Sequence, residues 1–263
     1  MEPLRPVLNP RAGWLGWWPR GGVAALLDPE NGRIADFLRE AAAVLPAGAR
    51  VLDASAGTRP YAPLFAAQQY ESCDVPGGFY KAQHDFLCFL DSVPRPDAHY
   101  DAVLLTQVLE HVPDPDAVLR ELRRVLKPGG RLILSVPLNG PLHGEPWHFF
   151  QFTHYGLAAL AQRHRYELTA CEKVGGAFWL LGKRAFVLVK SLMKQVDPLR
   201  AKKRGRSVAL SALATLLYLP FWLVLAPLLG LVLRPLCYWL DRLDLEKSFT
   251  TGYTAVFIRP AAG

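Results

Sequence analysis

The sequence predicts an α/β protein with a mostly parallel sheet that is covered by helices on both faces. Short apolar segments bounded by turn residues alternate with segments of helical periodicity, a pattern typical of parallel sheets. Two of the apolar segments end in carboxylates, Asp53 and Asp74, which lie 21 residues apart. Beyond residue 176 the alternation stops, so we expect an insertion of a different kind before a last strand at residues 252–259.

The individual elements follow from the apolar spacing and from the residues that interrupt it. Asp28-Pro29 is typical of a helix N-terminus, with an N-cap followed by proline at the first helical position. The strongest helical pattern spans residues 116–126, and Lys127-Pro128-Gly129-Gly130 ends it. We expect further helices from about residue 60 and over residues 155–163, and strands over residues 50–54, 80–86, 101–106, 131–136 and 166–171 and up to Asp74.

Composition and charge indicate what the surface contacts. Hydrophobic residues make up 51% of the 263 residues and charged residues 20%, which predicts that part of the surface meets lipid or a partner. The net charge of +7 comes from residues 181–206, where nine basic residues and one acid give +8 and leave −1 for the rest of the chain. One local basic cluster argues against a protein-wide nucleic-acid surface and favours contact with anionic lipid headgroups.

The segment Val51–Gly57 and the acid Asp74 predict a cofactor site. One apolar strand stops at Asp53 and turns through small residues, and the next strand ends in Asp74. In an open α/β sheet, a small-residue turn lets a ligand approach the backbone, and an acid at the end of the next strand accepts hydrogen bonds from ribose hydroxyls. The pair therefore predicts an enzyme that uses a nucleoside-bearing cofactor.

Four motifs in order resemble those of the class I S-adenosylmethionine-dependent methyltransferases, and within them the type-11 group. The motifs are Val51–Gly57, Asp74, Tyr100–Val112 and Leu126–Leu132. The resemblance covers about residues 30–175 and 249–259. It implies a Rossmann-like sheet of seven strands, the last one antiparallel, with S-adenosyl-L-methionine over the carboxyl ends of the strands. The later motifs, in particular residues 107–112, do not suit the alternative of an NAD-dependent oxidoreductase.

The resemblance also implies a role for each residue that matches a motif. Asp53 and the turn through Ser55 and Gly57 would pass under the methionine portion of the cofactor. Asp74 would hold the ribose. At the end of the fourth strand, beside the sulfonium and the acceptor, the resemblance places Thr106 and Gln107.

Two departures from the family pattern concern this cofactor site. Ser55 and Arg59 stand where the family has the first and third glycines of the turn, and a left-handed serine costs about 1 kcal/mol or more. Phe89 stands where the family often has an acid that binds the adenine amino group. The alternatives for adenine are Asp85, Asp91, or backbone groups beside Phe89 and Leu90.

Residues 141–153 follow the fifth strand, where the fold builds its acceptor pocket, and they contain the candidate catalytic residues His143 and His148. Either histidine could deprotonate an acceptor hydroxyl, because imidazole titrates near neutral pH; a solvated or helix-capping histidine is the alternative. Methyl transfer from an activated sulfonium needs chiefly in-line positioning, so a dedicated base is not required. For Glu110-His111 we expect a structural or supporting role, because adjacent residues on a helix do not face each other.

Residues 207–233 contain no charged residue and follow a basic run. One straight helix of this length would extend roughly 40 Å, against about 30 Å for the core of a bilayer. If the flanking strands share one sheet, however, the chain must leave and return on the same side of a membrane. Pro220 and Pro227 favour a break, so we expect a helical hairpin in one leaflet and a further helix at residues 178–192 in the interface. The alternatives are packing on the domain, a homodimer seam, or a single span.

These expectations define three segments and one function. The segments are an irregular Trp/Pro-rich arm (1–27), a methyltransferase domain (28–175 and 249–263) and a basic, apolar membrane-associating insertion (176–248). We expect methyl transfer to a lipid-linked or amphipathic small molecule at the cytoplasmic face of the inner membrane, without a nucleic-acid partner. The alternative is an inactive membrane scaffold with the same fold. The four cysteines form no CxxC pair, so we expect no metal site, no disulfide framework and a reducing compartment.

Overall fold

The structure is a computed structural model that describes residues 29–203, 205 and 207–261. The expected Trp/Pro-rich arm at residues 1–27 lies outside these residues. Contacts divide the described residues into two compact units. Residues 33–174 and 251–261 form the sheet unit, and residues 175–250, together with residues 29–32, form the helical unit.

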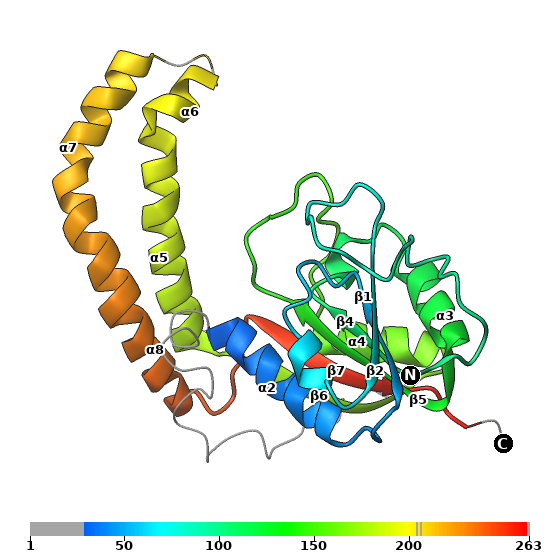
Figure 1. Ribbon diagram of the computed structural model, residues 1–263. Coiled ribbons are helices and arrows are strands. Elements are labelled where there is room, and N and C mark those ends of the chain that lie inside the picture. Colours follow the sequence, from blue (N-terminus) through cyan, green and yellow to red (C-terminus); the bar gives the residue numbers. More distant parts are fainter. Residues whose placement is uncertain (1–28, 204, 206, 262–263) are drawn as a thin grey trace. The chain divides into compact units, whose positions relative to one another are not determined.

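The sheet unit contains a seven-stranded sheet with the strand order β3-β2-β1-β4-β5-β7-β6 (Figure 1). The last strand, β7, runs antiparallel to its neighbours β5 and β6, whereas the pairs β3-β2, β2-β1, β1-β4 and β4-β5 are parallel. This mixed sheet confirms the predicted Rossmann-like fold class. The strands are β1 (Arg50–Ala54), β2 (Gln69–Asp74), β3 (Phe86–Leu87), β4 (Tyr100–Thr106), β5 (Leu126–Pro137), β6 (Glu167–Val174) and β7 (Gly252–Ile258).

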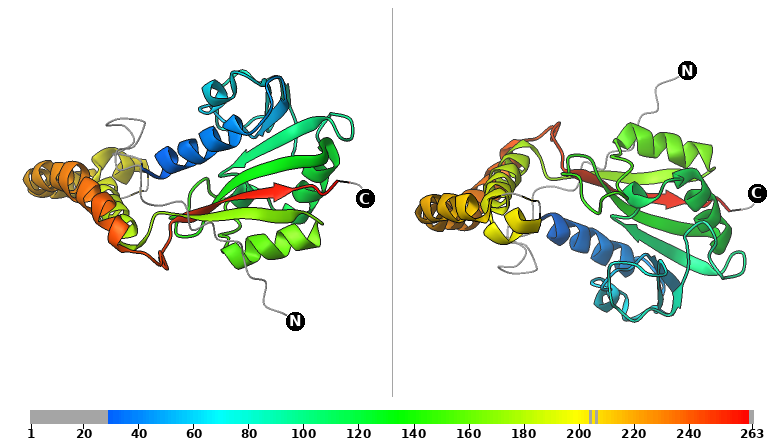
Figure 2. Two further views of the ribbon diagram at one scale, coloured as in Figure 1. Left: turned by 90° about the horizontal axis from the view of Figure 1, so that it is seen from below. Right: turned by 90° about the horizontal axis from the view of Figure 1, so that it is seen from above.

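Helices cover both faces of this sheet, as near-continuous apolar runs in parallel strands require. Side chains alternate along each strand, so Leu52 and Val103 face a core with α3 (Pro115–Val125) and α4 (His154–Arg163). Val51 and Leu104 face the opposite core, which they share with α2 (Pro29–Ala43). Figure 2 shows α2 on one face of the sheet and α4 on the other.

Local capping explains where two of these helices begin. Asp114 precedes α3, and its side chain accepts a hydrogen bond from the backbone N–H of Ala117 at 3.0 Å. Thr153 precedes α4, and its hydroxyl oxygen accepts from the N–H of Gly156 at 3.0 Å. Both side chains satisfy amides that the first helical turn leaves without a partner. The α4 cap also ends the loop that follows β5.

Two sequence expectations on the cofactor side of the sheet are wrong. The helix expected from residue 60 is only a 3₁₀ helix, η1 (Ala62–Phe65), because Pro60 and Pro63 each lack an amide donor. The strand expected over residues 80–86 is reduced to β3, which pairs with β2 through Phe86 and Leu87. Residues 75–85 instead form a loop that begins with Pro76-Gly77-Gly78, residues that favour turns.

The helical unit is a hairpin, but its legs differ from the expected ones. One leg is α5 (Ala177–Val196), as expected for a helix over residues 178–192. The other is one continuous helical run from Val208 to Leu243, so the expected break within residues 207–233 is wrong. The run passes through Pro220 and Pro227 and continues after Pro227 as a π-helical segment. Its parts are α7 (Val208–Pro227), η3 (Leu228–Leu233), α8 (Arg234–Leu240) and η4 (Asp241–Leu243), with the short α6 (Pro198–Lys203) between the legs.

Small residues let the two legs pack closely, side by side along their length (Figure 1). A Cβ on Gly182 of α5 would lie 2.9 Å from Cβ of Cys237 in α8, and one on Gly230 would lie 3.2 Å from the Phe186 ring. At the base, the Asp241 carboxylate accepts from the backbone N–H of Trp179 at 2.9 Å. Side-chain packing and this cap hold the hairpin together.

The helical unit leaves and rejoins the sheet unit at neighbouring backbone positions. Thr251 donates its backbone N–H to the carbonyl oxygen of Val174 at 3.0 Å, and its hydroxyl donates to the same oxygen at 2.6 Å. Val174 ends β6 and Gly252 begins β7, which pair with each other. Residues 175–250 are therefore an insertion whose two ends are adjacent. This agrees with the expectation that the chain leaves and returns on the same side if the flanking strands share one sheet.

Candidate cofactor and acceptor site

The turn after β1 is left-handed at three alternate residues. Ser55, Gly57 and Arg59 have φ values of 62°, 55° and 59°, a region that favours glycine. At Gly57 the requirement is also steric, since a Cβ there would lie 3.3 Å from the Tyr80 ring. Ser55 and Arg59 hold strained conformations that the surrounding contacts must stabilise, which is typical of functional turns.

The Asp74 carboxylate, at the end of β2, contacts Ser55 and Gly57 of this turn. Its Oδ1 accepts from the Ser55 hydroxyl at 3.1 Å and from the backbone N–H of Val75 at 2.7 Å. Its Oδ2 accepts from the backbone N–H of Gly57 at 3.1 Å. A carboxylate has about four lone pairs, so three are used inside the turn. The remaining one on Oδ2 is near the buried ring of His84, whose Nε2 lies 3.7 Å away.

Asp53 lies at the end of β1, where its side chain is buried. It is 1% exposed, and Oδ2 accepts a hydrogen bond from the Tyr70 hydroxyl at 2.6 Å. Burial raises the pKa of Asp53 to about 6, and the Tyr70 hydrogen bond and the nearby Arg59 offset this only in part. The other oxygen of Asp53, Oδ1, is buried without a hydrogen-bond partner among the described residues.

The ends of β4 and β5 are joined beside this turn. Gln107 follows Thr106, the last residue of β4, and has a φ of 55°. Its backbone N–H donates to the carbonyl oxygen of Ser135 at 2.9 Å, and its side-chain amide donates to the Ser135 hydroxyl at 3.3 Å. Two contacts to one residue of β5 hold Gln107 at the carboxyl end of the sheet.

The residues considered for binding adenine differ in whether they are exposed or already hydrogen-bonded within the protein. The Asp85 carboxylate accepts from the backbone N–H and the hydroxyl of Ser72, at 2.8 and 2.9 Å. It therefore ties the loop to β2, whereas Asp91 is exposed. Phe89 is exposed and Leu90 is buried.

Three histidines from two segments meet at the start of the loop that follows β5. His143 and His148, the expected catalytic candidates, pack edge to face with ring centroids 4.5 Å apart. His111, the last residue of η2 (Leu109–His111), joins them at 4.7 and 5.5 Å. Burial lowers the pKa of His111, and the two neighbouring imidazoles add to the effect. Its place in this group could not be read from the sequence, because η2 and the loop are 32 residues apart.

Glu110 attaches the same loop through its backbone. Its carbonyl oxygen accepts from the N–H of Phe149 at 2.8 Å and from that of Phe150 at 3.3 Å, while its side chain is buried. Around these contacts, the loops on this side of the sheet expose large apolar side chains. They are Phe79, Tyr80, Leu87, Phe89, Leu142, Trp147, Phe149 and Phe150.

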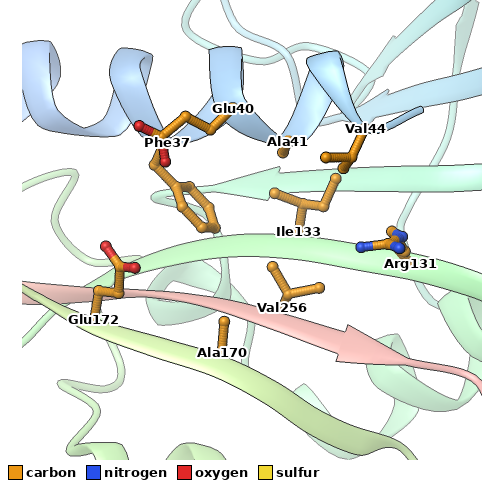
Figure 3. Close-up of a pocket in the computed structure, with 9 residues that line it drawn as sticks. All are labelled: Phe37, Glu40, Ala41, Val44, Arg131, Ile133, Ala170, Glu172 and Val256. Carbon is orange, nitrogen blue, oxygen red and sulfur yellow. The ribbon is translucent and has the colours of Figure 1, made fainter. Parts of the chain in front are cut away.

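A shallow pocket of about 170 Å³ lies elsewhere, between α2 and the sheet (Figure 3). Phe37 and Val44 of α2 line it together with Ile133 of β5 and Val256 of β7. It contains none of the expected cofactor or catalytic residues, and Ile133 is in the middle of β5 rather than at its carboxyl end. This pocket is not the site that the sequence predicts.

The match to a known family decides the identity of the domain. The sequence profile of a family described as a methyltransferase domain matches residues 29–172. The chain belongs to the S-adenosylmethionine-dependent methyltransferases. Its cofactor is S-adenosyl-L-methionine, which confirms the expectation from the four motifs.

Curated relatives of this methyltransferase carry matching names. It is 33% identical over 162 residues to an uncharacterized methyltransferase from Mycobacterium sp. (strain JLS), covering 56% of this chain and 61% of that protein. It is 32% identical over 133 residues to a ubiquinone biosynthesis O-methyltransferase from Xanthomonas oryzae pv. oryzae (strain PXO99A), covering 45% and 55%. The match therefore spans less than two thirds of the length of these relatives.

Among solved structures, the crystal structure of the [4+2]-cyclase SpnF superimposes with a TM-score of 0.50. The two sequences are 21% identical, and the alignment covers 97% of this chain and 85% of the cyclase. At this identity the likeness shows the fold alone. Because the neighbour is named as a cyclase, the fold does not specify the reaction.

The residues of the turn fit the chemistry of the cofactor. Asp74 has one carboxylate lone pair left for a ribose hydroxyl, and the Ser55 hydroxyl on Oδ1 can yield to a second one. At Gly57 the lack of a Cβ admits the Tyr80 ring, which packs against the backbone of the turn. When bound, the cofactor supplies a methyl group on a sulfonium; the turn, Asp74 and the end of β4 would hold and orient it.

We expect Asp74→Asn to weaken binding of S-adenosylmethionine by about 1–3 kcal/mol, because a ribose hydroxyl loses its charged acceptor. Isothermal titration calorimetry measures the change. Asp97→Asn is the matched control, since the Asp97 side chain is 79% exposed and pairs only with Arg124 among the described residues. Equal affinities in the folded Asp74→Asn variant and the control would move the ribose contact to another residue.

The raised pKa of Asp53 predicts how stability depends on pH. Between about pH 4 and pH 6 the folded protein binds the Asp53 proton and the unfolded chain releases it, so this carboxyl makes folding less favourable as the pH rises. Relative to wild type, Asp53→Asn should gain roughly 3 kcal/mol of unfolding free energy from pH 4 to pH 7. Urea unfolding at a series of pH values measures it, with the exposed Asp91→Asn as control. Parallel curves for wild type and Asp53→Asn would contradict the shift.

Proposed function

We propose that this methyltransferase transfers a methyl group to a lipid-linked or amphipathic small molecule at a membrane surface, on the cytoplasmic face. The observation that carries the proposal is the joining of a cofactor-binding sheet unit to a helical unit with a large exposed apolar surface. The sheet unit would bind the methyl donor. The helical unit would hold the enzyme at a membrane, where amphipathic acceptors are found.

The exposed apolar surface is concentrated on one helical run. Among the described residues, only Val208–Leu243 is both long and apolar enough to cross a bilayer, and 6% of its most apolar window is buried. Leu217 and Val224, for example, are 71% and 70% exposed. Apolar surface in water is unfavourable by about 25 cal/mol per Å², and patches of this kind mark membrane or protein contacts. Lipid is the cover that this surface fits best, because the run carries no charge from residue 208 to residue 233.

The hairpin geometry favours insertion from one side. The helical unit starts and ends at the Val174–Thr251 contact, so both of its ends are on the side of the sheet unit. Lys194 and Lys202, near the tip of α5 and in α6, are exposed and lie in the segment that carries the basic excess. With the hairpin lying along the membrane surface, basic side chains at its tip would attract anionic headgroups by about 1 kcal/mol each.

The exposed aromatic residues of the loop that follows β5 support an amphipathic acceptor. Trp147, Phe149 and Phe150 are in the same loop as His143 and His148, contact one another and leave apolar surface uncovered. The relative named as a ubiquinone biosynthesis O-methyltransferase supports an oxygen nucleophile on a small molecule. In this proposal Gln107 and the histidine loop position the acceptor, which is the larger part of what methyl transfer needs.

A second candidate function is an inactive membrane scaffold with the same fold. Ser55 and Arg59 replace two turn glycines, and Phe89 replaces an acid. The scaffold requires that S-adenosylmethionine, if bound, is not consumed. Turnover therefore separates the two functions.

The full-length protein should transfer label from methyl-labelled S-adenosylmethionine into the organic phase of a bacterial membrane lipid extract. Asp74→Asn should lower the rate at subsaturating cofactor by about the same factor as it lowers affinity, and Asp97→Asn should not. Scintillation counting of the extracted phase measures the transfer. Cofactor binding without label in any lipid fraction would favour the scaffold and contradict the enzyme.

The full-length protein should also float with vesicles that contain anionic lipid. A variant in which a short Gly/Ser linker replaces residues 176–249 should stay with the soluble fraction and still bind cofactor, because the linker joins adjacent backbone positions. High salt should release little of the full-length protein, since burial of apolar side chains is not screened by ions. Complete release by salt would show that the hairpin is not inserted.

A further inference from the structure

Three potential metal ligands converge where η2 meets the loop after β5. One ligand atom each from Glu110, His111 and His143 lies within 4.8 Å of the others. The Nε2 atoms of His111 and His143 are 3.1 Å apart, and Nε2 of His111 is 3.9 Å from Oε1 of Glu110. The three side chains come from segments that the folded sheet brings together.

The hydrogen bonds of the two rings assign their neutral tautomers. Nδ1 of His111 is 2.5 Å from the carbonyl oxygen of Trp147, and Nδ1 of His143 is 3.1 Å from that of Pro141. A carbonyl oxygen can only accept, so each Nδ1 carries the ring proton. Each Nε2 then presents a lone pair, and the two lone pairs face each other. Facing lone pairs repel, so this arrangement calls for a positive charge between or beside them.

His148 has a different role in the group. Its Nδ1 accepts a hydrogen bond from the backbone N–H of His143 at 3.2 Å, so its ring proton is on Nε2 and that atom offers no lone pair. His148 is therefore a positioning residue that holds the backbone of His143. It is neither a metal ligand nor a base while this bond exists.

We propose that Glu110, His111 and His143 bind one divalent transition-metal ion, with Zn²⁺ the best match to two imidazoles and one carboxylate. Ligand atoms of a tetrahedral zinc lie roughly 3.3 Å apart, given bonds of about 2.0–2.1 Å, and the two Nε2 atoms are near this spacing. Both histidines donate the other ring N–H to a backbone carbonyl, as metal-bound histidines do. Three protein ligands leave a coordination position open.

From the sequence we expected no metal site, because the cysteines form no CxxC pair. The ligands proposed here are two histidines and a glutamate, which that argument did not consider. The role of the metal rests on the proposed function, although its binding does not. His111 is four residues after Gln107 in the chain, on the acceptor side of the fold. An acceptor hydroxyl in the open position would lose its proton to water more readily, because a bound divalent cation lowers the pKa of the group it coordinates.

Metal binding can be measured on the full-length protein without cofactor or acceptor. The protein is purified without a histidine tag, treated with EDTA, dialysed, and titrated with Co²⁺ by visible absorption and with Zn²⁺ by calorimetry. We expect one equivalent of either ion and an increase in melting temperature. His111→Ala and His143→Ala should weaken binding at least about tenfold, and Glu110→Gln should weaken it as well. His99→Ala is the matched control, because His99 lies at the opposite end of β4.

The outcomes separate the metal site from the methyltransferase function. Failure of wild type to bind one equivalent would overturn the site and leave a proton shared between His111 and His143. Unchanged binding in both alanine variants would overturn it too, since the metal would then bind elsewhere. Cofactor affinity in the same variants shows that they fold. Metal binding that depends on His111 and His143 in a protein without methyl transfer would uphold the site and contradict the proposed function alone.

Discussion

The return of the chain as β7 is the constraint on which the rest of the structure depends. β7 fills the place between β5 and β6, where it pairs with both over its full length from Gly252 to Ile258. Backbone pairing on both sides buries the strand and leaves it no alternative position. Thr251 adds two hydrogen bonds to Val174, so the segment between them must close on itself. A helical hairpin is the simplest apolar structure that does this.

A second constraint operates at the same carboxyl edge of the sheet, in the turn after β1. Three of the five residues from Ser55 to Arg59 have a left-handed backbone conformation, which is unfavourable for residues other than glycine. Only one of the three, Gly57, is a glycine. Asp74 compensates by accepting hydrogen bonds from Ser55 and Gly57. The carboxylate that the family would use for ribose is thus also the group that shapes the turn. If Asp74 binds the ribose, cofactor binding and turn geometry are coupled through one side chain.

The loop after β5 is the segment to which the proposed function assigns the acceptor. The loop is attached by backbone hydrogen bonds from Phe149 and Phe150 to Glu110, and it carries two of the three clustered histidines. Its apolar side chains remain exposed, while its polar groups bond to each other and to η2. This division of polar and apolar groups is typical of a surface that receives an amphipathic ligand.

Most of the fold and part of the site could be predicted from the sequence, because both depend on local patterns. Apolar runs fixed β1 at Arg50–Ala54 and the end of β2 at Asp74, and the motif order fixed the family. Local patterns failed where proline content changed the helix type at η1 and where β3 was shortened by its loop.

Contacts between distant segments were decided by the tertiary structure alone. Pro220 lies inside its helix without breaking it, although its ring removes one backbone hydrogen bond, and no local pattern reveals this outcome. The pairing of His111 with His143 likewise required the fold, since 32 residues separate them and only the sheet places the ends of β4 and β5 side by side. The sequence by itself determined which residues could do chemistry; the tertiary structure decided which of them meet, because meeting depends on strand order and not on spacing along the chain.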